Sequence, residues 1–402
     1  MSNIIPESPP GPAFVFPRLD VQQLESDRKD QATAVDTFGR NIIAELQKEK
    51  PNVLISALSI HEALMMTANG ALGDTLTCMK TGLCLKNPSS DEPINVLHAQ
   101  VTAGATMENR APLYTLANSI WISDKLPIYR GFVDECSSVF QADAKTLDLS
   151  KKDCTDTINK WVVDATKGLI EKVVDDIHPQ TRLVLVNAIH FQQKFDKPFK
   201  KPLTRERDFR LFGGGTKKVE MMKQTETMAY FNEGDVEGVI LQFELNDAQM
   251  VVMLPKEEGL AALHKVASTW LAGDQFSRLI DSSKPGRIEL QLPKFEIGFE
   301  GSLKPVLIKL GMEKAFSDTA RFPRISETDL KIDDVVHKAK LRVDEDGVEA
   351  AAATGVTMMP RMFRPEPDPI ATVVVDRPFV VGLMDRRDKL LFFSGVVSDL
   401  GV

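Results

Sequence analysis

"LVLVNAIHFQQKFDKPF", residues 183–199, carries the strongest structural signal in the chain. Its first part, Leu183–Ile189, is almost entirely apolar, which is typical of a strand covered on both faces. A second apolar run, MVVML, spans Met250–Leu254. RIELQL, at Arg287–Leu292, instead alternates apolar and polar residues, as a half-exposed strand does. The later part of the chain is therefore predicted to be rich in strands.

Helical periodicity marks the earlier part of the chain. From about Ala34, apolar residues recur at helical spacing, and the segment INKWVVDATKGLI places its apolar residues on one face. Helices early and strands late, without strict alternation, predict an α+β fold rather than a doubly wound sheet. No linker divides the chain after the proline- and charge-rich residues 1–30. We expect a mobile arm over 1–30 and a single domain over 31–402.

Composition limits the classes of partner. The formal net charge of −8 argues against a general binder of nucleic acid or of acidic membranes. The basic run from Lys194 to Arg210 is diluted by acidic residues, so it is predicted to be a solvated face, with a polyanion site as the alternative. The first residues lack a charged leader with an apolar core, which predicts an intracellular, cytoplasmic location. An extracellular location is expected if a leader was removed or if secretion is unconventional.

Motifs for enzymatic chemistry are absent from the sequence. There is no G-x-S-x-G, no phosphate-binding glycine loop and no H-E-x-x-H, and the six histidines are scattered. The four cysteines lack the spacing of a metal or redox site and are expected to be free thiols. We therefore expect neither a metal nor a cofactor, and an unrelated hydrolase is kept only as a residual alternative.

The segment GVEAAAATGV, Gly347–Val356, is unusual for its run of small residues. It is too short to form a stable isolated helix in water. As a strand it would turn Val348 and the even-numbered residues after it to one face, and Glu349 to the opposite face, toward solvent. The first face is small or β-branched and could enter an existing sheet without a large cavity. Composition alone favours a flexible surface loop for this segment, and the rest of the chain reverses that preference.

Several segments, in the same order along the chain, resemble those of the serpin family from about Ala34 to Val397. They are EDGVEAAAAT (Glu345–Thr354), VNAIHFQQKFDKPF (Val186–Phe199), ANSIWI (Ala117–Ile122), LPKFEI (Leu292–Ile297), LGMEKAF (Leu310–Phe316) and VHKAKLRVDEDG (Val336–Gly347). The first of them resembles the hinge of inhibitory members. On this resemblance the hinge residues are Glu345, Gly347, Val348, Glu349, Ala350, Ala351, Ala352, Ala353 and Thr354.

This resemblance implies an α+β fold of three β-sheets surrounded by eight or nine helices, with an exposed reactive loop over about 345–377. It also implies a polar cluster under the central sheet, where strands part, formed by Ser56, Ser59, Asn187 and His337. Considered alone, His337 is simply a core histidine. The chain departs from the family pattern at three residues, with Ala57 in place of proline, Phe195 in place of tryptophan and Val348 in place of threonine or serine. Its loop after residue 362 is also longer than usual.

The implied activity is covalent trapping of a serine protease by a monomeric inhibitor. The attacked residue lies sixteen after the hinge acid, and 345 + 16 = 361, which gives the bond Arg361–Met362. Arginine suits the acidic pocket of trypsin-like proteases, and the rival Arg364 precedes a proline. The residues expected to contact the protease are Met358, Met359, Pro360 and Phe363.

Two of these residues keep other target proteases open. Phe363 would suit a chymotrypsin-like enzyme, and Met358 an elastase-like or chymotrypsin-like one. The alternative function is a non-inhibitory serpin that acts as a binding or chaperone protein. Bulky, charged or proline-bearing hinges favour that function, and the alanine run here does not.

Overall fold

The computed structural model describes residues 4–5, 21–86, 114–211, 213–244, 248–271, 273–349, 368–386 and 389–400. Its α-helices are α1 (Val21–Leu46), α2 (Ala57–Ala68), α3 (Asp74–Gly82), α5 (Arg130–Phe140), α6 (Cys154–Ala165), α7 (Leu260–Trp270), α8 (Gly273–Ser282), α9 (Lys304–Leu307) and α10 (Glu313–Phe316). Helix α1 overlaps the predicted arm over 1–30. The prolines on which the arm was predicted all precede Val21, and most of the residue types that follow it favour helices.

The described strands form sheets of seven, nine and two strands. The seven-stranded sheet, here called the central sheet, has the order β5 (Asp143–Leu147), β3 (Tyr114–Ser123), β6 (Leu183–Phe191), β14 (Asp334–Val343), β15 (Gly347–Val348) and β7 (Gln193–Lys194), and β13 (Phe295–Ser302) also pairs with β14. The small sheet joins β1 (Ile4–Ile5) to β4 (Ile128–Tyr129).

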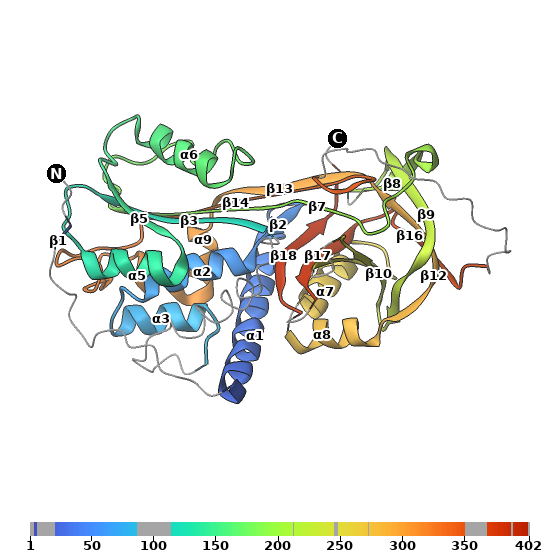
Figure 1. The fold of residues 1–402 in the computed structure, drawn as a ribbon, viewed down its shortest axis with the longest axis horizontal. Coiled ribbons are helices and arrows are strands. Elements are labelled where there is room, and N and C mark those ends of the chain that lie inside the picture. Colours follow the sequence, from blue (N-terminus) through green and yellow to red (C-terminus); the bar gives the residue numbers. More distant parts are fainter. Residues whose placement is uncertain are drawn as a thin grey trace.

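The nine-stranded sheet fills the other half of the molecule (Figure 1). Its order is β16 (Ala371–Val374), β12 (Lys284–Pro293), β9 (Thr216–Glu233), β10 (Val236–Gln242), β11 (Ala248–Pro255), β17 (Phe379–Asp385), β18 (Leu391–Val397) and β2 (Val53–Ile55), with β8 (Arg205–Arg210) paired to β9. MVVML lies in the fully buried β11, and RIELQL lies in β12 with alternating burial. Both strand predictions are confirmed.

The central sheet is covered on both faces, as the apolar run in β6 predicted. Figure 1 shows α2 on one side of this sheet and α6 on the other. Leu185 and Ile189 of β6 belong to the main core, whereas Val184 and Val186 belong to the smaller core that contains α6 residues. Alternate side chains of β6 therefore point to opposite faces, which we call the core face and the α6 face.

Helices α1 and α2 pack very closely at Ala57, the position where the family pattern has proline. A Cβ atom added to Gly39 would lie 2.5 Å from the Ala57 Cβ. The glycine in α1 therefore allows the two helices to approach one another beside the cluster residue Ser56. All four cysteines are free thiols, as predicted.

Candidate functional site

The start of the predicted hinge lies inside the central sheet. After β14 the chain turns back and forms β15, in which Val348 is opposite Val343 of β14 and Gln193 of β7. The Val348 side chain is completely buried, in the main core. The expectation that Val348 suits an apolar sheet is thus met by the described structure, in which the first hinge residues already separate β14 from β7.

Gly347 permits this close insertion. Its φ angle is +150°, and a Cβ atom at this position would lie 2.3 Å from the Gln193 carbonyl oxygen and 2.8 Å from the Lys194 Cα. Both are backbone atoms, which cannot rotate away as a side chain can. Any other residue at position 347 would therefore push β15 and β7 apart.

The acidic residues before Gly347 fix the turn into the sheet. Glu345 is buried, and its carboxylate accepts hydrogen bonds from Thr204 Oγ1 at 2.7 Å and pairs with Lys294 Nζ at 3.1 Å. Burial acts to raise the pKa of Glu345, but the bonds from Thr204 and Lys294 outweigh burial and hold the pKa below its usual value. The Phe199 amide also donates to the Glu345 carbonyl at 2.9 Å.

Phe195, which stands where the family pattern has tryptophan, belongs to an aromatic cluster beside this turn. Its ring stacks on Phe243 with centroids 5.4 Å apart and meets Phe199 edge-on at 5.9 Å. The Phe195 amide donates to the Asp346 carbonyl at 3.0 Å. These rings fill the end of the sheet without the larger indole.

Glu349 differs from the sequence-based expectation that it faces solvent. Its side chain does point to the face opposite Val348, but it pairs there with His190, whose side chain is 3% exposed against 18% for Glu349. The Glu349 amide donates to the Arg342 carbonyl at 2.9 Å, and Gln192 donates to the Glu349 carbonyl. The φ of Glu349 is +45°, a left-handed conformation that costs about 1–2 kcal/mol. The sequence predicted correctly that Glu349 and Val348 point to opposite faces. It did not predict that Glu349 would contact His190 instead of facing solvent.

The four residues of the predicted polar cluster do lie together, under the central sheet. Ser56 is the N-cap of α2 and accepts from the Ser59 amide at 3.2 Å. The Ser56 amide donates to His337 Nε2 at 3.3 Å, and His337 Nδ1 lies 2.5 Å from Asn187 Oδ1. Because Nε2 accepts, Nδ1 carries the proton and donates to Asn187. The Asn187 amide in turn donates to Ser59.

Burial keeps the histidine of this cluster neutral. Complete burial lowers the pKa of His337 to about 3. The hydrogen bond between His337 of β14 and Asn187 of β6 crosses the boundary between those two strands, which are directly paired at this level. The cluster therefore holds the central sheet closed at its middle.

Sequence reasoning missed two members of this network, Asn118 and Glu62. Asn118 of β3 accepts from Asn187 and donates to Glu62 of α2 at 3.3 Å. Burial raises the pKa of Glu62 to about 8. The available signals were the one carboxylate of α2, a helix whose residues are mostly apolar, and the asparagine near the middle of β3.

The attacked bond and its neighbours lie outside the described residues, as does most of the hinge. These are Ala350, Ala351, Ala352, Ala353 and Thr354 of the hinge, and Met358, Met359, Pro360, Arg361, Met362 and Phe363. Their assignment remains a prediction from the sequence.

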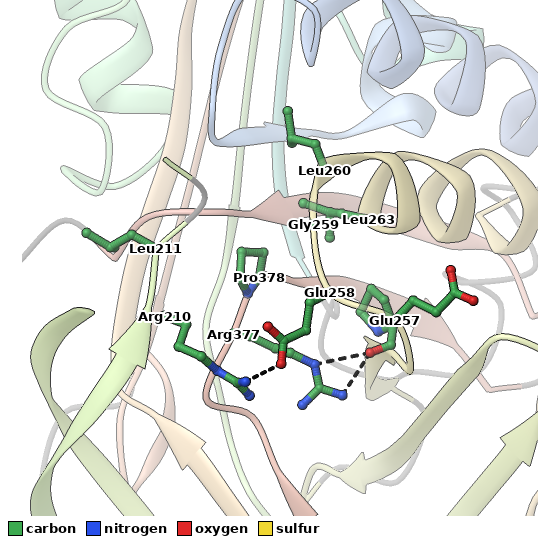
Figure 2. Close-up of a pocket in the computed structure, with 10 residues that line it drawn as sticks. Arg210, Leu211, Glu257, Glu258, Gly259, Leu260, Leu263, Arg377 and Pro378 are labelled. Carbon is green, nitrogen blue, oxygen red and sulfur yellow. Dashed lines mark hydrogen bonds and ion pairs between the residues drawn. The ribbon is translucent and has the colours of Figure 1, made fainter. Parts of the chain in front are cut away.

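The far end of the predicted reactive loop is anchored on the nine-stranded sheet. Strand β16 pairs in parallel with β12, and Arg210 of β8 donates to Asp376 at 2.8 Å. Figure 2 shows Arg210 directed toward Glu258, and Arg377 beside Pro378, around a cavity of about 60 Å³. The Arg377 guanidinium donates to the Pro255 carbonyl at 2.8 Å. Both arginines are thus engaged within the protein.

The basic run from Lys194 to Arg210 is paired in part with acidic residues. Lys197 pairs with Glu226, Lys201 with Asp346, and Arg210 with Asp376. Such pairs are usual on a solvated face, and the polyanion site stays an alternative from the sequence. In the described part of the chain, no helix combines the length and apolarity needed to cross a membrane.

The α+β fold, with Gly347–Val348 paired as a short strand inside the central sheet, agrees with the family resemblance found in the sequence. The sequence profile of the family described as "Serpin (serine protease inhibitor)" matches residues 33–400. The chain belongs to the serpin family, whose members are generally protease inhibitors.

Individual relatives agree with this assignment. Serpin B6 of Pongo abelii is 31% identical, over 91% of this chain and 98% of its own. The crystal structure of the thermophilic serpin Tengpin in the native state superposes with a TM-score of 0.82 at 28% identity, over 96% of both chains. Human thyroxine-binding globulin, in complex with thyroxine, has a TM-score of 0.82 at 23% identity, over 94% of this chain and 100% of its own, and shows the shared fold.

Proposed function

We propose that this chain is a covalent trapping inhibitor of trypsin-like serine proteases, attacked at Arg361–Met362. The observation that carries the proposal is the position of Val348, which is buried between β14 and β7 at the start of a run of small residues. A hinge whose first residues are already paired on both sides can extend the sheet by adding further residues. Bulky or charged residues are absent from the alanine run that follows.

The chemistry begins as ordinary proteolysis. The protease serine attacks the Arg361 carbonyl, an ester bond forms, and the Arg361–Met362 peptide bond breaks with a proton passing to the Met362 amine. The freed hinge then inserts as a strand of the central sheet and carries the attached protease with it. Insertion of the reactive loop into a sheet is a known conformational change of serpins. Inhibition requires that insertion be faster than hydrolysis of the ester.

The pairing already formed gives the register of the inserted strand. Moving along the hinge from Val348 to Thr354 moves the partner from Gln193 to Asn187 on one side, and from Val343 to His337 on the other. These two partners are the residues that now pair directly with each other. Two independent extrapolations thus meet at one pair. In the inserted form Thr354 would separate Asn187 from His337 on the core face.

The test is incubation with trypsin, followed by a denaturing gel. We expect a stable covalent band at the summed mass, and no such band with trypsin whose active-site serine has been blocked. Cleavage without a covalent band would support the non-inhibitory alternative. Hydrolysis of added substrates by the protein itself would support the enzyme alternative.

The proposed mechanism requires a native state that stores free energy for insertion. The only partner that it requires is the protease. The inhibitor is proposed to act as a monomer, without cofactor, metal or nucleic acid. A cytoplasmic location is also part of the proposal.

A further inference from the structure

The contacts of Glu349 indicate that the hinge is fixed in the sheet at a defined point. We define the hinge seat as Gly347, Val348 and Glu349 together with His190 of β6. Val348 lies on the core face between two strands, and Glu349 pairs with His190 on the α6 face. The chain is therefore held from both faces of the central sheet.

We propose that His190 and Glu349 are positioning residues that keep the first hinge residues inserted, so that insertion starts from a preformed nucleus. The left-handed φ of Glu349 turns the chain out of the sheet at this point. Such a conformation persists in a non-glycine residue only when its surroundings hold it. The ion pair, the bond from the Glu349 amide to Arg342 and the bond from Gln192 supply that hold.

Amide hydrogen exchange of the full-length protein tests the seat without any protease. The Glu349 amide is hydrogen-bonded to Arg342 only while the hinge is seated. Glu349→Gln and His190→Gln should each lower protection of the Val348 and Glu349 amides by about tenfold, since each removes a charge-assisted bond. The double variant should be no less protected than either single variant.

The controls separate the seat from general destabilisation. Glu296→Gln removes the exposed ion pair with Lys340 on the neighbouring strand and should leave the seat amides unchanged. The buried amides of β10 and β11 report global opening in every variant. Unchanged protection in both single variants, or effects that simply add, would overturn the proposal.

The consequence for inhibition rests on the proposed function, whereas the seat itself does not. If the protein traps trypsin, Glu349→Gln should increase the number of inhibitor molecules consumed per protease inactivated. If no trapping occurs but the exchange results are as expected, the proposed function fails and the seat stands. If trapping occurs and the exchange is unaltered, the seat fails alone.

Discussion

At the scale of single residues, the proposed function makes Arg361 the residue on which target choice depends. Its side chain would enter the acidic pocket of a trypsin-like protease as a charge-assisted, desolvated pair. Arg361→Ala should slow the inhibition of trypsin by at least about tenfold, because a lost charged bond exceeds 1.4 kcal/mol. The second-order rate constant with trypsin is the measurement. A large effect of Phe363→Ala together with a small effect of Arg361→Ala would place the attacked bond elsewhere.

Gly347→Ala tests how closely the hinge approaches β7. The added methyl group would lie 2.3 Å from the Gln193 carbonyl oxygen, so the backbone must shift. We expect a loss of about 1–3 kcal/mol of stability, seen as a lower melting temperature, with faster exchange of the Val348 amide. Gly213→Ala is the matched control, since a Cβ atom there would contact nothing within 4 Å. Similar melting temperatures for the two variants would contradict the close approach.

The sequence predicted some residues of the site but not the hydrogen bonds and ion pairs that join them. Ser56, Ser59, Asn187 and His337 were expected to be together because of the family resemblance, and they are. The sequence did not predict a role for Glu62 or His190. Glu62 has a raised pKa because the folded chain buries it, and His190 of β6 bonds to the hinge residue Glu349. Both features depend on residues that are far apart in the sequence. Such contacts exist only after folding.

At the scale of elements, the proposed function predicts that alternation along the hinge decides which substitutions stop insertion. If the register of β15 continues along the inserted hinge, Ala351 would come to lie opposite Lys340 on the α6 face, whereas Val348 faces the core. Val348→Glu would bury an unpaired carboxylate at a cost of several kcal/mol, so the protease should be released and the inhibitor consumed. Ala351→Glu places the same group beside a lysine and should change little. Glu349 is unsuitable as the control because of its contact with His190.

The measurement for this pair is the number of inhibitor molecules cleaved per protease inactivated. That number should rise steeply for Val348→Glu only. Equal values for the two variants would mean that the register from β15 does not continue along the hinge.

Among the elements, strands with a clear apolar or alternating pattern were predicted reliably, and the boundaries of elements were not. The strands β6, β11 and β12 follow from hydrophobic pattern alone. The turn at Glu349 could not be predicted, since a positive φ at glutamate opposes local preference and is held by neighbouring strands. The two residues of β15 are likewise defined by the partners on either side.

At the scale of the whole molecule, the proposed function requires a native state that is not the most stable one. Cleavage of the loop by a protease that is not a target should let the hinge insert and raise the melting temperature well above that of the intact protein. Scanning calorimetry of cut and uncut protein measures this. Equal melting temperatures would leave no energy stored for trapping.

The buried carboxyl of Glu62 predicts how stability depends on pH. Burial raises its pKa from 4.5 to about 8, so between these values the folded state holds a proton that the unfolded state releases. Stability from this group is therefore present below about pH 4.5 and declines as the pH rises toward 8, by at most about 1.4 kcal/mol per pH unit. Glu62→Gln should flatten the decline between about pH 6.5 and 8, measured as urea midpoints. If the urea midpoints of the unaltered protein and of Glu62→Gln changed in parallel with pH, Glu62 would not be the source of the decline in stability.

The strands β17 and β18 come late in the chain, yet they lie between β11 and β2 and are almost completely buried. On the ribosome, β11 and β2 therefore wait for partners that are synthesised more than a hundred residues after β11. Helix α1, which leaves the ribosome early, cannot complete its packing against β18 until that strand has been made. During that interval the unpaired edges of β11 and β2 would be available to other chains. Chaperone dependence should thus be greatest in the interval before β17 and β18 leave the ribosome.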